Sequence, residues 1–151
     1  MQTNTPLIFH NIQTSTDVEK AFPIIKELRS HLTYEEFLHL YKLAKAEHNY
    51  TLVMVLQKNS QVEIPVAVFG YRIYTDFIHK RHLYIDDLVT TAEFRSKGIG
   101  AKVLNYAETL AKELHCHGMR LCTGIDNEDG KKFYEKNNWD LRAVAYKKKI
   151  L

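Results

Sequence analysis

Apolar residues recur along the chain with two different periods, and these periods predict which segments are helices and which are strands. Helical spacing, with an apolar residue every three or four positions, occurs at Val18–Leu32, Phe37–Ala44 and Val103–Leu114. Runs rich in β-branched and apolar residues predict strands at Leu7–Ile12, Tyr50–Gln57, Ile64–Tyr74, Arg81–Thr91 and Met119–Ile125. A short helix and a last alternating strand are predicted at Asn127–Asn137 and Trp139–Lys148.

Polar residues at the ends of these segments supply the expected boundaries. Ser15–Asp17 offers side chains that can cap the first helix, and Thr33 with Glu36 forms the capping-box pattern at the second. The polar stretch 58–61 predicts a hairpin turn, and Gly118 is a candidate C-cap for the third helix. The predicted order is β-α-α-β-β-β-α-β-α-β, an α/β sandwich with helices packed on a mixed, mostly antiparallel sheet.

Length and charge narrow the class of protein. With 151 residues, of which 45% are hydrophobic, we expect a single domain over residues 1–151. The formal net charge of +3 is spread along the chain, which argues against a nucleic-acid-binding surface. No apolar run approaches the ~20 residues that cross a bilayer, and the polar start MQTNT does not resemble a signal peptide. We therefore expect a cytoplasmic protein that binds neither membranes nor nucleic acid.

The densest group of potential metal ligands is His115, Cys116 and His117, followed by Cys122. This group lacks the paired CxxC or HxxxH spacing that is typical of zinc sites. We therefore expect no metal centre.

The stretch FRSKGIG, Phe94–Gly100, points most clearly to a chemical role. It follows a predicted strand and opens a predicted helix, so several backbone N–H groups at the helix start have no intrahelical partner. Gly98 and Gly100 let a ligand approach the backbone, and Arg95 and Lys97 add positive charge to that of the helix dipole. Together these features predict a site for a phosphate or pyrophosphate.

Two common phosphate-binding loops do not match this stretch. A dinucleotide-binding fingerprint requires a third glycine where Val103 stands, and a P-loop requires Gly-Lys followed by Ser or Thr in another spacing. The pattern that remains is RxxGxG after a strand. Taken alone, Gly-Ile-Gly is equally consistent with a tight turn between a strand and a helix.

In its context, LYIDDLVTTAEFRSKGIG resembles the central strand and pyrophosphate loop of the GNAT superfamily, the acetyl-CoA-dependent N-acetyltransferases. Arg95, Gly98 and Gly100 match the R/Q-x-x-G-x-G/A signature of that family. The resemblance is specific over about Leu83–Tyr146 and weaker before it.

A second segment, NEDGKKFYEKNNW, resembles the family pattern N-x-x-A-x-x-F-Y-x-x-x-G-F, with matches at Asn127, Phe133, Tyr134 and Trp139. Three positions depart from the family: Ala92 stands where proline is common, Gly130 where alanine is common, and Asn138 where glycine is usual. None of these changes removes a group with a chemical role. Asn can also adopt the left-handed backbone conformation that glycine would provide.

The resemblance implies a splayed central strand and a site for acetyl-CoA as co-substrate. Backbone groups of Leu88, Val89 and Thr90 would pair with the acetyl and pantetheine parts, and the Leu88 N–H would meet the acetyl carbonyl. The pyrophosphate would lie against backbone N–H groups of Arg95, Ser96, Lys97, Gly98, Ile99, Gly100 and Ala101. Asn127 is expected to contribute to the same site.

Candidate catalytic groups follow from what acetyl transfer to an amine requires. The nitrogen must be neutral, whereas an alkyl ammonium with a pKa near ~10 is mostly protonated at neutral pH, so a base is needed. Asp86 and Asp87 are the candidate bases, with Asp86 preferred and acting through water, while an ion pair with Lys80 or Arg81 is an equally supported role. Since side chains alternate along a strand, we expect the two carboxylates on opposite faces. By resemblance, Tyr134 is the general acid toward the leaving thiolate; packing on a helix face is its structural alternative.

The acceptor is expected to be a primary amine of a small molecule, attacking the acetyl group directly in a ternary complex. The acidic strand would attract a cation, and YIDDL resembles the paired acids of polyamine acetyltransferases. His31, Tyr34 and Glu35 are candidates for the acceptor pocket, although a lone histidine is often a hydrogen-bonded structural residue. The alternatives are a protein N-acetyltransferase and a non-catalytic acyl-CoA sensor. The resemblance also suggests a homodimer.

Overall fold

The computed structural model describes residues 5–151, which divide into two compact units, one ending at Arg120 and one from Leu121 to Leu151. A five-stranded sheet has its strands in the spatial order β1-β2-β3-β4-β5. The first four strands pair as antiparallel neighbours. The bounds are Leu7–Asn11 for β1, Thr51–Asn59 for β2, Val62–Asp76 for β3, Lys80–Thr90 for β4 and Gly118–Leu121 for β5.

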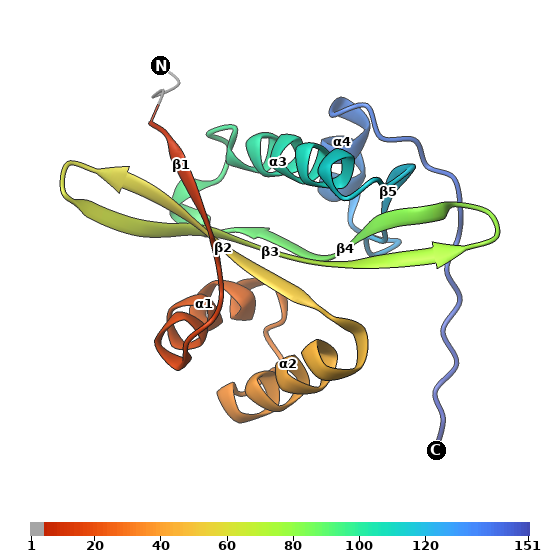
Figure 1. Ribbon diagram of the computed structural model, residues 1–151, viewed down its shortest axis with the longest axis horizontal. Helices are drawn as coiled ribbons and strands as arrows, with labels where there is room; N and C mark the ends of the chain where they lie inside the picture. The colour runs from red at the N-terminus through yellow and green to blue at the C-terminus, as the bar shows by residue number, and fades with distance from the viewer. Residues whose placement is uncertain (1–4) are drawn as a thin grey trace. The chain divides into compact units, whose positions relative to one another are not determined.

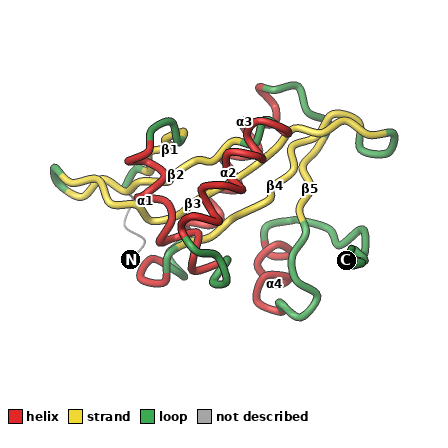
Figure 2. The backbone as a smooth tube through the Cα atoms, turned by 90° about the horizontal axis from the view of Figure 1, so that it is seen from below, coloured by secondary structure: helices red, strands yellow, loops and turns green. Residues whose placement is uncertain are grey.

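Helices of the first unit cover both faces of this sheet. Figure 1 shows α1 and α2 on one face and α3 on the other, and Figure 2 shows α1 and α2 in front of the strands when seen from the first of these faces. Their bounds are Ser15–Leu28 for α1, Tyr34–His48 for α2 and Ile99–Glu113 for α3; a short 3-10 helix, η1, spans Ala92–Phe94. This is the α/β sandwich that the apolar periodicity predicts.

Two sets of apolar side chains hold the layers together. Beneath α1 and α2, a buried cluster combines helix residues with the sheet residues Leu52, Met54, Val68 and Val89. On the other face, the buried residues of α3 are Ile99, Val103, Leu104, Ala107 and Ala111. Fully burying a side chain of this size stabilises a fold by about 1.5–3 kcal/mol, so these contacts fix β4 between the two helical layers.

The predicted helix starts are confirmed with one shift in position. Thr33 and Glu36 form the reciprocal capping box of α2. The first helix is capped by Thr14 rather than by Ser15–Asp17, and Asp17 is the partner that closes its capping box. Because the hydroxyl of Thr14 reaches the N–H three residues ahead, the cap lies just before the predicted segment.

The two hairpins extend beyond the helices at opposite ends of the sheet (Figure 1). The polar connection expected between the strands predicted at Ile64–Tyr74 and Arg81–Thr91 is shortened to a turn at 77–79, since Thr75 and Asp76 pair with Arg81 and Lys80. The side chain of Phe77, in the turn of this hairpin, is fully exposed.

Three predictions are wrong: two concern where an element ends, and one concerns a strand that does not form. Gly118 is not the C-cap of α3: the helix ends at Glu113 and His115 takes the left-handed conformation, with φ 58°, while Gly118 begins β5. β5 ends at Leu121 rather than at Ile125. In the second unit, α4 spans Glu128–Lys136, and the predicted strand Trp139–Lys148 is not formed. Alternation of apolar and polar residues does not by itself make a strand, because the backbone N–H and C=O groups of a strand also need a partner strand to bond with.

Within residues 5–151, no helix combines the length and the apolar character that a membrane span needs.

Candidate functional site

The pairing of β3 with β4 contains an extra residue at Asp86. Gly70 lies opposite Asp87 and Tyr71 lies opposite Ile85, so Asp86 has no opposite residue. Such a β-bulge locally breaks the alternation of side chains along the strand.

Because of the bulge, both carboxylates lie on one face of the sheet, and the predicted placement on opposite faces is wrong. Side chains two residues apart on a strand point to the same face, so Gly70 and Arg72 share a face of β3. Their partners across the ladder, Asp87 and Tyr84 respectively, therefore lie on that face too. Asp86 is two residues after Tyr84 and so lies on that face too. Val68 and Val89, buried beneath α1 and α2, identify it as the face that these helices cover.

Asp86 is held by an arginine of the neighbouring strand. Both carboxylate oxygens accept hydrogen bonds from Arg72, with Nε–Oδ2 at 2.8 Å. The guanidinium also stacks on the ring of Tyr74, 4.8 Å from its centroid. The hydrogen bonds to Asp86 raise the pKa of Arg72 above its ordinary value. A two-pronged contact of this kind fixes the direction of the carboxylate.

Asp87 is held by groups from the α1–α2 side. The Tyr50 hydroxyl donates to Asp87 Oδ2 at 2.7 Å, and Arg29 Nε donates to Oδ1 at 3.1 Å. Arg29 Nη2 also donates to the backbone carbonyl of Asp86 at 3.1 Å. Burial, followed by the charge of Asp87, raises the pKa of Tyr50 well above its ordinary value, so its hydroxyl stays a donor at neutral pH.

Gly70 is the residue that makes room for Tyr50. A Cβ atom at Gly70 would overlap the hydroxyl and ring of Tyr50. This close approach explains a glycine inside an otherwise apolar strand, and glycine in a strand often marks a bulge or such a contact.

Neither Lys80 nor Arg81 pairs with the two acids, in contrast to the alternative drawn from the sequence. Arg81 Nε donates to the Leu114 carbonyl instead. The ionic partners of Asp86 and Asp87 are Arg72 and Arg29, which the sequence pattern did not indicate.

The edge of β4 beyond the bulge is only partly occupied. Leu88, Val89 and Thr90 pair with β3 on one side. On the other side β5 begins beside Arg81, whose carbonyl accepts from His117 N at 2.7 Å. β5 has four residues, or about 13 Å, whereas Leu88 lies about 23 Å along the strand from Arg81, so β5 cannot accompany β4 that far.

A carboxylate of α1 anchors the loop that follows β4. Glu27 accepts hydrogen bonds from Thr91 Oγ1 at 2.6 Å and from Ala92 N at 2.9 Å. Arg95 Nη2 lies 3.6 Å from Glu27 Oε1, and Arg95 Nε donates to the Thr90 carbonyl at 3.1 Å. The Arg95 side chain therefore contributes to the shape of the loop.

Backbone N–H groups are exposed where this loop enters α3. Gly98 is the N-cap in the left-handed conformation, with φ 80°, and no side chain caps the helix. Lys102 N makes the first bond of the helix, to the Gly98 carbonyl at 3.2 Å. The N–H groups of Ile99, Gly100 and Ala101 therefore precede the first intrahelical bond and are available to an anion.

Positive charge accompanies these donors. Lys97 Nζ lies 5.0 Å from the centre of the Phe94 ring. Lys97 and Lys102 line a cavity of about 120 Å³ together with Thr5, Leu7, Gln57, Phe94 and Ile99. Ser96 is also left-handed, with φ 60°, which turns the chain sharply before the glycines.

Glu27→Gln is expected to loosen this loop without unfolding the protein. The substitution keeps an acceptor for Ala92 N but removes the charge that faces Arg95, which we expect to cost about 1 kcal/mol. Hydrogen exchange of the 91–98 amides should speed up by about fivefold, while exchange in β3 is unchanged. The matched variant Glu19→Gln, elsewhere on α1, should change neither; equal effects in both would contradict the anchoring role.

The residues predicted for the acceptor pocket lie around the start of α2. Tyr34 packs edge-on against Phe22, with ring centres 5.4 Å apart, so part of its role is structural. His31 and Glu35 are exposed, whereas Tyr34 is half-buried. His31 lies two residues from Arg29, whose guanidinium contacts both acids, so the connection between α1 and α2 reaches the bulge through Arg29.

In the second unit, Asn127 caps α4. Its Oδ1 accepts from Gly130 N at 3.0 Å, and its Nδ2 donates to Thr123 Oγ1 at 2.9 Å. A Cβ at Gly130 would lie within 3 Å of the Asn127 amide and of Thr123 Oγ1. This packing explains glycine where alanine is usual in the family pattern.

Tyr134 lies in an aromatic group of the same unit. Its ring centre is 5.1 Å from that of Phe133 and 5.8 Å from that of Trp139. Burial raises the pKa of Tyr134, which keeps the phenol protonated. The next turn contains Asn138 with φ 66°, which confirms that asparagine supplies the left-handed conformation here.

Comparisons with known proteins identify the family. Residues 13–139 match the model of the Acetyltransferase (GNAT) family. The uncharacterized N-acetyltransferase YhdJ of Bacillus subtilis (strain 168) is 32% identical over 133 residues, covering 87% of this chain and 90% of the relative. The chain therefore belongs to the GNAT acetyltransferase family.

Solved structures agree on the fold. A transcriptional regulator from Bacillus halodurans C-125 matches with a TM-score of 0.79 and 19% identity, covering 96% of this chain and 100% of the other. Aminoglycoside N-acetyltransferase AAC(6')-Iy, solved in complex with CoA, matches with a TM-score of 0.77 and 13% identity, covering 99% of each chain. The family resemblance, the α/β fold and the acetyltransferase class, whose acyl donor is acetyl-CoA, are thus confirmed.

Proposed function

We propose that this protein transfers an acetyl group from acetyl-CoA to a primary amine of a small molecule, by direct attack in a ternary complex. The observation that carries the proposal is the arrangement along one short stretch of chain. Within residues 86–101 lie a bulge with two carboxylates on one face, a strand edge that β5 does not reach, and a helix start with free N–H groups.

In this proposal, residues of the first unit bind the coenzyme A part of the co-substrate. Leu88, Val89 and Thr90 offer their open edge to the pantetheine, and Leu88 N–H donates to the acetyl carbonyl. The N–H groups from Ser96 to Ala101 hold the diphosphate, with Lys97 adding charge, whereas Arg95 N already donates to the Ala92 carbonyl at 3.4 Å. Acetyl-CoA supplies the acetyl thioester. AAC(6')-Iy, which shares the fold, has been solved with CoA and with a bisubstrate analog, and this supports the assignment.

Proton transfer is assigned to three side chains. Asp86 takes a proton from the acceptor ammonium through water, with Asp87 as the second candidate base. The amine nitrogen then forms the C–N bond as the C–S bond breaks, and Tyr134 Oη gives its proton to the departing sulfur. The second proton, which the nitrogen loses as it becomes an amide, returns to the Tyr134 phenolate through water. Asn127 supports the cofactor site from the start of α4. In this proposal residues 1–151 work as one domain, which is supported by a family match that crosses the boundary at Arg120.

The acceptor pocket is proposed to involve His31, Tyr34 and Glu35. Arg29 and Arg72 offset the charge of the two acids, so the attraction for a polycation is weaker than YIDDL suggests. A small amine that makes specific contacts is therefore favoured over a general attraction for polyamines. The cytoplasm, where acetyl-CoA is available, is the proposed location, and a homodimer is the proposed assembly.

Release of free thiol from acetyl-CoA tests the proposed activity. The purified protein is assayed with polyamines, aminoglycosides, amino acids and peptides as acceptors. We expect turnover with at least one small amine at neutral pH. Binding of CoA by calorimetry without turnover on any acceptor would favour an acyl-CoA sensor, and turnover on peptides alone would favour a protein acetyltransferase.

Gly98→Ala tests the diphosphate site directly. Alanine at φ 80° costs about 1–2 kcal/mol in the left-handed region, and relaxation of this strain moves the first N–H groups of α3. We expect CoA affinity, measured by calorimetry, to fall at least about tenfold.

Gly118→Ala is the matched control, because a Cβ there has open space around it. Its CoA affinity should equal that of the unmodified protein. If Gly98→Ala bound CoA as tightly as this control, the diphosphate site would have to be placed elsewhere.

A further inference from the structure

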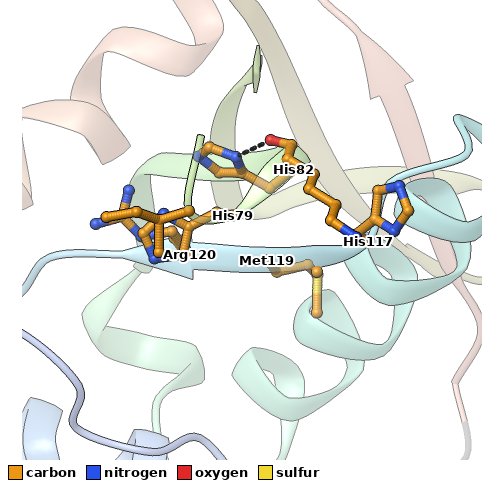
Figure 3. A pocket seen from close by; sticks show the side chains of 8 residues that line it. His79, His82, His117, Met119 and Arg120 are labelled. Atoms are coloured by element: carbon orange, nitrogen blue, oxygen red, sulfur yellow. Dashed lines mark hydrogen bonds between the residues drawn. The ribbon is translucent and has the colours of Figure 1, made fainter. Parts of the chain in front are cut away.

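A cavity of about 310 Å³ lies between the β3–β4 turn and β5, at the start of β4 rather than at the bulge. Figure 3 shows the side chains of His79, His82, His117, Met119 and Arg120 gathered around it. Lys80, at the start of β4, also lines it. The volume is within the range of small-ligand sites, and most of the polar lining groups are cationic or can become so.

His82 in this lining has a buried nitrogen without a partner. The side chain is only 2% exposed. Nδ1 lies 2.9 Å from the Lys80 carbonyl (Figure 3), an acceptor, so Nδ1 carries a proton, and in the neutral imidazole Nε2 then presents a lone pair. Nε2 is buried with no hydrogen bond among the described residues. Buried polar atoms are nearly always satisfied, so this nitrogen points to a missing donor.

The nearest charged group cannot supply that donor. Asp76 Oδ2 lies 4.0 Å from His82 Nε2, too far for a hydrogen bond. Hydrogen bonds from the backbone and ring of His79, and from Ile78 N, lower the pKa of Asp76 to about 2, so the carboxylate has no proton to give. With the His82 ring neutral, two acceptors therefore face each other, and Arg120 Nη1 lies 3.9 Å from the same carboxylate.

A ligand that satisfies these groups must carry negative charge and also donate a hydrogen bond. Lys80 and Arg120 call for an anion, while His82 Nε2 calls for an O–H or N–H. Carboxylates and sulfate have no proton to donate at neutral pH. Hydrogen phosphate has both kinds of oxygen on one small tetrahedral group.

We propose that this cavity is a binding site for inorganic hydrogen phosphate, held by Arg120 and Lys80 and oriented by a P–O–H hydrogen bond to His82 Nε2. Because Nε2 is shielded, the exposed turn at 77–79 gives way as the anion enters. The site lies at the far end of β4 from the loop assigned to the diphosphate of coenzyme A.

The test follows the imidazole nitrogens of His82 by NMR while inorganic phosphate or sulfate is added at pH 7.5 and constant ionic strength. Phosphate should shift the Nε2 resonance and bind at least about tenfold more tightly than sulfate. Arg120→Gln should weaken phosphate binding about tenfold, since it removes a charge-assisted contact. Lys97→Gln, in the other phosphate-binding loop, should leave the His82 response unchanged.

His82→Asn keeps a donor for the Lys80 carbonyl but removes Nε2, so phosphate should lose its advantage over sulfate. If this buried variant does not fold, the titration of the unmodified protein and Arg120→Gln decide the matter. Equal affinity for the two anions, an unmoved Nε2 resonance, or a response that follows Lys97 rather than Arg120 would each overturn the proposal. None of these readouts depends on acetyl transfer, so the site stands or falls separately from the proposed activity.

Discussion

Tyr134→Phe is expected to lower kcat by about 10² to 10³-fold while leaving CoA affinity within about twofold. The phenol is the proposed donor to the departing sulfur, and loss of a positioned general acid typically costs this much. Removing one hydroxyl keeps the ring packed against Phe133 and Trp139, so α4 should retain its place. Steady-state kinetics give kcat, and calorimetry gives the affinity for CoA.

The pH dependence gives a second check on the same residue. Burial raises the pKa of Tyr134, so the phenol stays protonated through neutral pH and kcat should fall only above about pH 10. Tyr146→Phe, which removes the hydroxyl of an exposed tyrosine, is the matched control and should leave kcat unchanged. A Tyr134→Phe enzyme as active as this control would remove Tyr134 from the mechanism.

Gly70→Ala is expected to lower the free energy of unfolding by about 2–3 kcal/mol. The new Cβ would occupy the space of the Tyr50 hydroxyl and ring, and overpacking of a tightly packed site typically costs this amount. Moving Tyr50 would also break its 2.7 Å hydrogen bond to Asp87. Urea denaturation measures the loss.

A double-mutant cycle assigns the cause of this loss. In a Tyr50→Leu background the overlapping atoms are absent, so Gly70→Ala should cost less than about 1 kcal/mol. A cost that is the same in both backgrounds would mean that backbone conformation at Gly70, rather than Tyr50, demands glycine.

Local signals in the sequence predict the helices well because their causes are local. The capping box at Thr33 and Glu36 and the apolar face of α3 each depend on residues within a few turns. The strand predicted at Trp139–Lys148 fails for the opposite reason, since a strand depends on a neighbour that its own pattern does not specify.

The loop Arg95–Ala101 is the part of the candidate site that the sequence predicts best, for the donors at a helix start follow from local chain geometry. The partners of the two acids could not be predicted in this way. Arg29 and Tyr50 lie 58 and 37 residues from Asp87, and Arg72 lies 14 residues from Asp86. One feature of the sequence does indicate the bulge: Gly70 is a glycine inside a strand, and it lies opposite Asp87, next to the extra residue.

The bulge at Asp86 adds a carboxylate to β4 without changing the pairing on either side of it. Ile85 and Leu88, on either side of the two acids, lie opposite Tyr71 and Phe69, so the pairs flanking the bulge keep the phase of a regular ladder. Asp86 is thus a surplus position: a chain lacking it could retain every neighbour in the sheet and yet lose one carboxylate. Deleting Asp86 would therefore remove the partner of Arg72 while leaving the pairs on either side of the bulge in register.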